Sequence, residues 1–316
     1  MPAVEVRELS KRYGSIEAVR GISFEVGEGE VFSLLGPNGA GKTTTVEILE
    51  GYRRRDEGTV SVLGHDPSRG ERALKERIGI VLQQTGVEEF LTVRETIEMY
   101  RGYYPHPRPT EEIIELVELG PKAETRITKL SGGQRRRLDV AIALSGDPDL
   151  LFLDEPTTGF DPAARRNAWT VVKNLADLGK TILLTTHYMD EAQFLADRVA
   201  IIRDGEIVAE GPPSTLAGRE TAATRIRFRT TAGAVPPPIA GVEAKVVDGT
   251  AELRTERPTQ VLHELTTWAV DAGRELEGLE VSRPSLEDVY LELTGGDRPA
   301  REEEPAPAGR RGRRRR

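Results

Sequence analysis

A glycine-rich segment near the N-terminus has the residue types and spacing of a phosphate-binding loop. Residues 36–43 fit the pattern G-x-x-x-x-G-K-[ST], in which glycines let successive backbone N–H groups point at phosphate oxygens. Lys42 would reach the β- and γ-phosphates of a nucleotide, and the Thr43 hydroxyl would bind Mg²⁺. The predicted phosphate site comprises Gly36, Pro37, Asn38, Gly39, Ala40, Gly41, Lys42, Thr43 and Thr44.

The surroundings of this loop favour a phosphate site over an ordinary glycine-rich turn. Residues 30–35 before it form an apolar run typical of a buried strand, and residues 43–50 after it have a helical pattern. The positive N-terminal end of that helix would add to the attraction for phosphate. A dinucleotide-binding fold is disfavoured, because no G-x-G-x-x-G follows a strand in this sequence.

Two carboxylates follow a second apolar run, at residues 150–153. Carboxylates that end a parallel strand lie at the edge of the sheet where nucleotides bind. Asp154 would hold Mg²⁺ through water, and Glu155 would orient and deprotonate an attacking water molecule. Taken alone, the pair is more often a helix cap, so this motif gains its weight from the phosphate loop.

The strand and helix patterns predict an α/β fold with a parallel sheet covered by helices. Buried strands are expected at 150–153 and 181–185, with a helix at 162–178 between them. Two earlier runs, at 4–9 and 22–26, alternate apolar and polar residues, as antiparallel strands with one wet face do. An antiparallel β-subdomain is therefore expected ahead of the parallel sheet.

We interpret the chain as three parts. The α/β part covers residues 1–218 and includes a helical insertion at about 91–145. Short alternating runs and two helical patterns predict a small C-terminal α+β domain at 219–296. Residues 297–316 combine glutamates, prolines and an arginine-rich end, which predicts a disordered tail.

Composition excludes several classes of protein. No stretch approaches the roughly 18 apolar residues of a membrane-spanning helix, and the first residues lack the pattern of a signal peptide. The chain has no cysteine, which excludes disulfides, thiolate catalysis and Cys-based zinc sites. The net charge of −8 includes the basic tail, so the body is acidic, and no specific nucleic-acid partner is expected. The tail either is a solvated end or contacts anionic lipid headgroups or nucleic acid.

A third motif stands between the phosphate loop and the acidic pair: Leu130, Ser131, Gly132, Gly133 and Gln134. Its helix start would present N–H groups and a hydroxyl to an anion, although Ser-Gly-Gly alone would support only a plain N-cap. With the other two elements in this order, the chain resembles the ABC-type ATPases over roughly residues 3–215. The resemblance implies a P-loop NTPase that uses ATP and Mg²⁺. It also implies a homodimer in which this signature faces the γ-phosphate held by the second copy.

Four further residues match smaller motifs of that family. The resemblance implies that Tyr13 stacks on adenine, that Asp161 contacts the second copy, and that His187 contacts the γ-phosphate. Gln83 would contact Mg²⁺ or the attacking water and sense the membrane subunit, although Gln84 is adjacent. Many relatives have Leu where Phe160 stands, which should spare the Asp161 carboxylate. The expected catalytic residues are Glu155, His187 and Gln83, and the expected metal ligands are Thr43, Gln83 and Asp154.

A finer resemblance lies at residues 284–295, which are similar to the closing segment of ATPase subunits from the daunorubicin/doxorubicin-resistance branch of ABC-2-type exporters. The same segment also reads as an amphipathic last helix capped by Ser285. The resemblance implies an ATPase at the cytoplasmic face of the membrane that powers export of a drug, antibiotic or lipid-like substrate through a separate permease. An importer ATPase is one alternative, and a soluble ABC-type ATPase acting on ribosomes or DNA is another. A regulatory P-loop switch protein is disfavoured by the signature.

Overall fold

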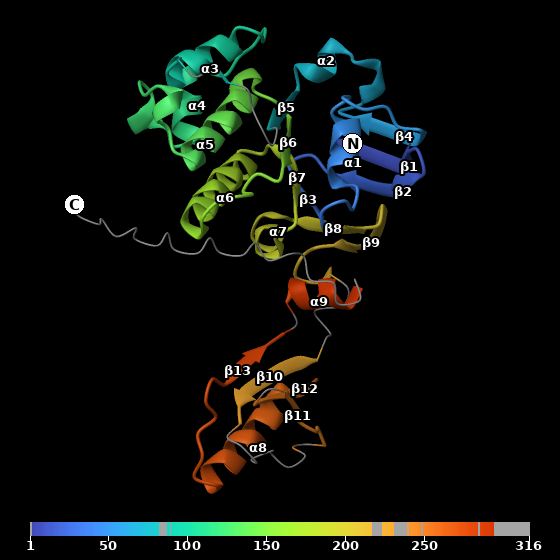
Figure 1. Cartoon of the computed structure of the whole chain (residues 1–316), viewed down its shortest axis with the longest axis vertical. Coiled ribbons are helices and arrows are strands. Elements are labelled where there is room, and N and C mark those ends of the chain that lie inside the picture. Colours follow the sequence, from blue (N-terminus) through green and yellow to red (C-terminus); the bar gives the residue numbers. More distant parts are fainter. Residues whose placement is uncertain are drawn as a thin grey trace, which may run out of the picture.

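The computed structural model shows two parts of unequal size with a helix between them (Figure 1). The larger part holds strands β1 to β9 and helices α1 to α7, the smaller part holds β10 to β13 and α8, and α9 lies between them. Gln83 and the predicted tail lie outside the described residues, and the domain boundaries at 218 and 296 stay predictions. The structure describes residues 2–81, 87–88, 90–216, 223–230, 239, 241–247, 249–283 and 285–293.

A six-stranded sheet forms the centre of the larger part, in the order β5-β6-β7-β3-β8-β9. The first five strands are parallel, and β9 pairs antiparallel with β8. Apolar residues fill both faces, as parallel sheets require. The strands are β3 (Val31–Leu35), β5 (Ile78–Val81), β6 (Leu150–Asp154), β7 (Thr181–Thr186), β8 (Arg198–Arg203) and β9 (Glu206–Gly211).

Alternate residues of β6 enter two different cores, because successive side chains of a strand point to opposite faces. Leu150 and Phe152 pack with the antiparallel sheet β2-β1-β4 and with α1. Leu151 and Leu153 pack with the helices of the insertion and with α6. The elements of the first core are β1 (Val4–Tyr13), β2 (Ile16–Val26), β4 (Glu57–Val62) and α1 (Lys42–Leu49).

The helical insertion begins with a capping box, in which Thr92 and Glu95 exchange hydrogen bonds at the start of α3. Its helices, together with α6, cover the face of the sheet opposite the antiparallel strands. The helices of the larger part not yet named are α2 (Arg72–Lys75), α3 (Val93–Arg101), α4 (Thr110–Leu116), α5 (Gly132–Ala143), α6 (Pro162–Asp177) and α7 (Met189–Leu195), with 3₁₀ turns at Pro67–Arg69, Gly120–Lys122, Ile127–Lys129 and Leu144–Gly146.

The predicted α/β class with an antiparallel subdomain, a helical insertion and a small α+β part is confirmed. Four strands of the larger part, β4, β5, β8 and β9, are absent from the sequence-based prediction. β4 and β9 are short, and they carry charged or small residues at alternate positions, so their apolar signal is weak. β4 pairs with β1, which is far away in sequence, so tertiary pairing decides β4. β9 pairs with β8 across the short turn at Asp204 and Gly205.

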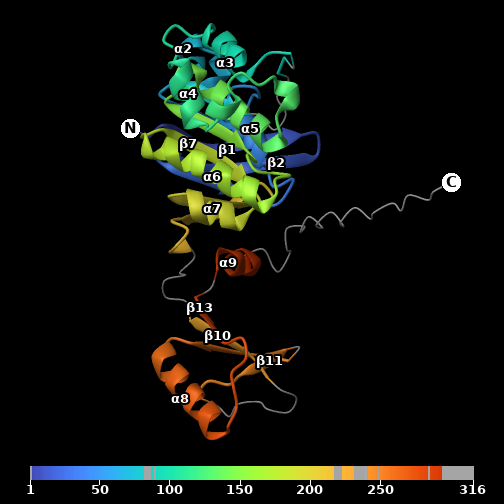
Figure 2. The ribbon, with the colours of Figure 1, turned by 90° about the vertical axis from the view of Figure 1, so that its left-hand side faces the viewer.

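The smaller part is a four-stranded antiparallel sheet, in the order β11-β12-β10-β13, with α8 on one face (Figure 2). Ile226, Phe228 and Leu253 from the strands pack against Val261 and Leu265 from the helix. Its elements are β10 (Thr224–Arg229), β11 (Lys245–Val247), β12 (Thr250–Thr255), α8 (Pro258–Asp271) and β13 (Glu280–Ser282).

The last helix, α9 (Leu286–Leu293), packs on the larger part. Leu286 and Tyr290 are buried in a cluster with residues of β3, β8 and α7. Asp288 of the same helix pairs with Arg225 of β10, with Oδ1 2.9 Å from Nη1. Helix α9 therefore contacts both parts of the chain. Among the described residues, no helix combines the length and apolar character needed to cross a bilayer.

Candidate functional site

The phosphate loop connects β3 to α1, and packing explains two of its glycines. A Cβ atom on Gly36 would lie 2.3 Å from the carbonyl oxygen of Ile202 in β8. A Cβ atom on Gly41 would lie 2.3 Å from the carbonyl oxygen of Ala18 in β2, and Gly41 has a φ of +104°. Only glycine fits such close approaches and such a conformation. These two positions let the loop sit directly against the neighbouring strands.

The Lys42 side chain is buried inside the loop, with 4% of its surface exposed. Its Nζ atom donates to the carbonyl oxygens of Gly36, at 2.8 Å, and Pro37, at 3.1 Å. It also lies 3.3 Å from Glu155 Oε1. Burial lowers the pKa of Lys42, while the Glu155 carboxylate opposes that shift. The ammonium group is therefore held by acceptors at the place where phosphate oxygens would meet the loop.

Asp154 ends β6 beside the first turn of α1. Its Oδ2 atom accepts a hydrogen bond from the Thr43 hydroxyl at 3.3 Å, and its Oδ1 atom accepts one from the Thr185 hydroxyl of β7. Mg²⁺ prefers hard oxygen ligands, takes only one or two from protein, and keeps water and phosphate oxygens as the others. One hydroxyl and one carboxylate side by side fit that donor set.

Glu155 follows Asp154 in a left-handed backbone conformation, with φ of +45°. Such a conformation costs a non-glycine residue on the order of 1 kcal/mol, so it needs support. The backbone N–H of Glu155 donates to the carbonyl oxygen of Thr185 at 3.2 Å and to its hydroxyl at 3.0 Å. The Thr158 hydroxyl donates to Glu155 Oε2 at 3.1 Å. These bonds fix the carboxylate over the mouth of the phosphate loop.

His187 follows β7 and meets the same carboxylate. Its Nδ1 atom lies 3.3 Å from Glu155 Oε1, a contact close enough for an ion pair but not aligned as a hydrogen bond. The nearby His187 ring lowers the pKa of Glu155 to about 2, and Lys42 adds to the shift, while partial burial opposes it. Glu155 is consequently ionised at neutral pH, with a cation on one side and an imidazole on the other.

The structure thus brings together five predicted site residues from three separate segments: Lys42, Thr43, Asp154, Glu155 and His187. Sequence reasoning missed Thr185 and Thr158, which hold the two carboxylates by hydroxyl hydrogen bonds. A threonine at the end of a strand gives no distinct signal, because threonine is common in strands.

The signature residues occupy a different place. Ser131 caps α5, where its hydroxyl accepts from the Gln134 N–H at 3.3 Å and its own N–H donates to Gln134 Oε1 at 3.0 Å. Ser131 is therefore the N-cap of α5, and both Ser131 and Gly132 are exposed. In the described part of the chain, the hydrogen bonds of residues 130–134 involve no residue of the phosphate loop. The chain does not bring its own signature to its own phosphate loop through these contacts.

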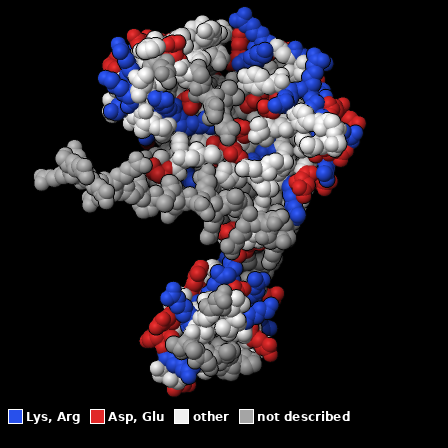
Figure 3. All heavy atoms as spheres, in the orientation of Figure 1, with Lys and Arg blue, Asp and Glu red and all other residues white. Residues whose placement is uncertain are grey.

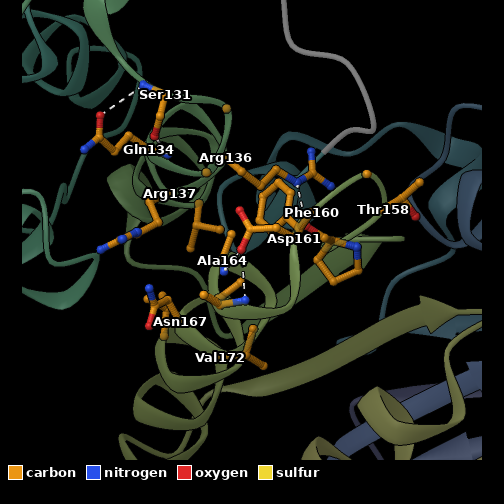
Figure 4. Close-up of a pocket in the computed structure, with 18 of the residues that line it drawn as sticks. Ser131, Gln134, Arg136, Arg137, Thr158, Phe160, Asp161, Ala164, Asn167 and Val172 are labelled. Atoms are coloured by element: carbon orange, nitrogen blue, oxygen red, sulfur yellow. Dashed lines mark hydrogen bonds between the residues drawn. The ribbon is translucent and has the colours of Figure 1, made fainter. Parts of the chain in front are cut away.

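Asp161 lies near the signature at the start of α6. Its Oδ1 atom accepts from the N–H groups of Ala163 and Ala164, both at 2.9 Å, so it is an N-cap as well. A cavity of about 560 Å³ lies between the start of α5 and α6, lined by Ser131, Arg136, Phe160 and Asp161 among others (Figure 4). Both the signature and Asp161 therefore face the same hollow.

Tyr13 ends β1, next to a tight turn that leads into β2. The residue is 38% exposed, and the cations of Lys11 and Arg53 lie 5.6 and 5.5 Å from the centroid of its ring. Tyr13 therefore closes a hairpin and is also exposed to solvent. Gln83, the remaining predicted site residue, is outside the described residues.

The fold and the site define a P-loop nucleoside triphosphatase with the signature of the ABC class. The family described as "ABC transporter" matches residues 19–158, and "ABC transporter domain-containing protein-like, C-terminal domain" matches residues 224–285. This chain belongs to the ATP-binding proteins of ABC transporters, and it hydrolyses ATP.

Similar proteins span nearly the whole chain. It is 40% identical over 309 residues to the daunorubicin resistance ATP-binding protein DrrA2 of Streptomyces coeruleorubidus, covering 93% of this chain and 95% of that protein. It is 39% identical over 306 residues to the Nod factor export ATP-binding protein I of Paraburkholderia xenovorans, covering 93% and 97%. Among solved structures, it resembles a dimeric post-hydrolysis state of an ATP-binding cassette bound to ADP and Pi, with a TM-score of 0.58, 27% identity and coverage of 66% and 98%.

Proposed function

We propose that this chain is the ATP-hydrolysing subunit of an ABC-2-type exporter, which drives a separate permease from the cytoplasmic face of the membrane. The observation that carries the proposal is the division of the site. Lys42, Asp154 and Glu155 meet at one place, while the hydrogen bonds given for the exposed Ser131 in the described part of the chain lie within its own helix cap. A site divided in this way is completed by a second copy, and such a pair can convert ATP turnover into movement.

The phosphate loop would bind ATP through its N–H groups and Lys42. Phosphate oxygens would replace the carbonyl and carboxylate acceptors that Lys42 now has, and burial would strengthen each contact. Thr43 and Asp154 would hold Mg²⁺, which would neutralise charge on the phosphates, with Gln83 as a further ligand by family resemblance. The exposed ring of Tyr13 would stack on adenine.

Glu155 and His187 would position the attacking water. A carboxylate with a pKa of about 2 is a weak base, so Glu155 would orient water more readily than it would deprotonate it. His187 lies on the same oxygen of Glu155 and would reach the γ-phosphate from the other side. The pair would favour in-line attack by orientation and by charge rather than by a strong base.

Ser131, Gly133 and Asp161 would act on the second copy of the chain. The hydroxyl and N–H groups at the start of α5 would face the γ-phosphate bound by the partner. Mixing two inactive variants tests this arrangement. Lys42→Ala removes the phosphate contact and Ser131→Arg blocks the signature, so each alone should lose ATPase activity.

In a mixed dimer, one site would have both an intact Lys42 and an intact Ser131, so the mixture should recover activity. A control mixture of Lys42→Ala with Glu155→Gln places both defects in the half that holds the phosphate, and it should stay inactive. Recovery in neither mixture, or in both, would contradict a site shared between copies.

Exposed aromatic residues on either side of α3 and after α1 support a membrane partner. Tyr52, Phe90 and Tyr103 are 66%, 74% and 71% exposed, which is unusual for large apolar side chains. Tyr52 follows α1 closely and influences the titration of Tyr104, so the two segments lie near each other. We propose that the permease contacts this surface.

Serine substitution of each aromatic residue tests that contact. The variants should keep basal ATPase activity but lose co-purification with a six-helix ABC-2-type permease. Val270→Ser, which removes an apolar side chain that is 76% exposed on α8, is the matched control and should change neither. Co-purification that survives all three aromatic substitutions would contradict the docking surface.

Export rather than import is favoured by the relatives, whose names refer to daunorubicin resistance and Nod factor export. We propose a drug, antibiotic or lipid-like substrate, and contact of the arginine-rich end with anionic lipid.

A role on ribosomes or DNA is less favoured, because Lys, Arg, Asp and Glu are interspersed over the face seen in Figure 3 rather than gathered into a basic stripe. ATP-dependent transport by reconstituted subunit and permease, with its direction, tests the proposal.

A further inference from the structure

Glu191 is a buried carboxylate that the mechanism above does not use. It lies in the first turn of α7, four residues after His187, and it is 0% exposed. Burying a carboxyl group without a hydrogen-bonded cation is unfavourable, and a leucine of similar size would avoid that penalty. A residue that carries such a penalty next to a reaction centre needs an explanation.

One oxygen of Glu191 joins two other segments. Its Oε1 atom accepts a hydrogen bond from the Thr157 hydroxyl at 2.8 Å and another from the Trp169 indole N–H at 2.9 Å. Thr157 lies two residues after Glu155, in the loop that leads from β6 to α6. Trp169 lies on α6 itself, eight residues after Asp161. Glu191 therefore connects the segment that carries His187 to the segment that carries Glu155 and Asp161.

Further contacts close the same interface between α6 and α7, which lie side by side (Figure 2). The Trp169 and Phe194 rings stack with centroids 5.2 Å apart. The Arg165 guanidinium lies 3.9 Å from the centroid of the Tyr188 ring. These contacts exclude water around Glu191, and hydrogen bonds in such surroundings are stronger than in water.

We propose that Glu191 is a positioning residue for ATP hydrolysis, which holds the segments after β6 and β7 together and so keeps His187 beside Glu155. Without the bridge, α7 and the loop at Thr157 would shift independently. The 3.3 Å contact between His187 Nδ1 and Glu155 Oε1 would then no longer be maintained. Nucleotide binding depends on the phosphate loop, which does not contact Glu191, so hydrolysis would be lost while binding remained. The inference rests on the ATPase activity of the chain but not on its membrane partner.

The test uses the full chain without permease, and it measures kcat, KM for ATP and Tm. Glu191→Leu removes both hydrogen bonds, and we expect kcat to fall by about tenfold or more, because small misplacements of reacting groups have large effects, with KM changed less than about threefold. Glu191→Gln keeps an oxygen that can accept both bonds, and we expect kcat within about threefold of wild type.

Thr157→Val removes one arm of the bridge without changing the volume of the side chain. We expect it to lower kcat by severalfold, and the double variant Glu191→Leu/Thr157→Val should be no slower than Glu191→Leu alone, because both changes break one network. Trp169 reports on the other arm. The chain has two tryptophans, so in a Trp268→Phe background the fluorescence comes from Trp169. In that background, the fluorescence emission should change in Glu191→Leu but not in Glu191→Gln.

Phe194→Leu is the matched control, because it removes the ring stacked on Trp169 and leaves the bridge in place. It should lower Tm with little change in kcat. The proposal is overturned if Phe194→Leu and Glu191→Leu lower kcat equally at equal loss of Tm. It is also overturned if Glu191→Gln is as slow as Glu191→Leu, or if the effects of Glu191→Leu and Thr157→Val are additive. Failure of the exporter assignment would leave all these rates unchanged, so the two outcomes can be told apart.

Discussion

Lys42 Nζ and Glu155 Oε1 lie 3.3 Å apart, so the cation that would bind phosphate is paired with the carboxylate that would orient water. Each group influences the charge of the other: Lys42 helps to lower the pKa of Glu155, and Glu155 opposes the fall in the pKa of Lys42. On the proposed mechanism, ATP would compete with Glu155 for the ammonium group. Once phosphate had taken Lys42, the carboxylate would be free to meet water.

The first prediction concerns Glu155→Gln. The neutral amide lacks the charge and one of the two acceptor oxygens with which the carboxylate would orient the attacking water, so ATP hydrolysis should fall by about 100-fold or more. ATP affinity should be unchanged or higher, because no carboxylate competes for Lys42, and the variant should accumulate as an ATP-bound dimer. Steady-state turnover, nucleotide titration and gel filtration measure these properties. A variant that stays monomeric with saturating ATP would contradict the shared site, and Thr158→Val, which removes one hydrogen bond to Glu155, serves as the milder control.

The second prediction concerns Glu50, a carboxyl group at the end of α1 that is 8% exposed. Burial raises the pKa of Glu50 to about 8 from its usual 4.5, and the charges of Asp154 and Glu47 add to the shift. The folded state thus binds more protons than the unfolded state between those values. The contribution of Glu50 to the free energy of unfolding should therefore be fully present at and below about pH 4.5. That contribution should be lost as the pH rises to about 8.

Glu50→Gln removes that dependence. It should stabilise the protein at pH 8 by on the order of 3 kcal/mol and have little effect at pH 5, because the wild-type side chain is already neutral in the fold there. Denaturant unfolding at the two pH values measures the difference. Glu98→Gln, which changes an exposed glutamate on α3, should show no such difference. Equal stability effects of Glu50→Gln at both pH values would rule out a buried, protonated Glu50.

The third prediction concerns Gly36→Ala. The added methyl group would lie 2.3 Å from the Ile202 carbonyl oxygen and 2.9 Å from Ile202 Cγ2, so either β8 or the phosphate loop must move. We expect a loss of about 1–3 kcal/mol in stability and weaker nucleotide binding. Thermal unfolding with and without ATP measures both. Gly120→Ala, where no atom lies within 4 Å of the added carbon, should change neither, and equal effects at the two positions would count against the close approach.

The fourth prediction concerns the docking of α9. Tyr290 is buried with Leu35, Val199 and Ile201, so Tyr290→Ala should reduce the free energy of unfolding by about 3–5 kcal/mol. Amide hydrogen exchange in α9 should become faster, because the helix loses its main anchor on the larger part. Val270→Ala, on the exposed side of α8, should leave both quantities unchanged. Unchanged exchange in Tyr290→Ala would mean that Asp288 and Leu286 alone hold the helix.

The sequence predicts the local parts of this protein well, because their signals are local. The spacing of Gly36, Gly41 and Lys42 indicates a phosphate loop wherever it lies between a strand and a helix. Carboxylates at the end of an apolar run place Asp154 and Glu155 at a sheet edge. Strand β4 escapes prediction, because its own pattern is weak and it pairs with β1, far away in sequence. Strands β8 and β9 did have a local signal, an apolar run followed by Asp204-Gly205, which the prediction did not use.

The residue types, the order of the motifs and the class of fold were all determined by the sequence. Only the tertiary structure decided that Lys42 and His187 both contact the same carboxylate oxygen of Glu155. It also decided that Glu50 is buried, and that Glu191 joins α7 to the loop at Thr157. Periodicity and turn chemistry act over a few residues and can be read along the chain. Contacts between residues of different segments, such as Lys42 and Glu155 or Thr157 and Glu191, depend on how the strands pair and the helices pack, which no local pattern contains.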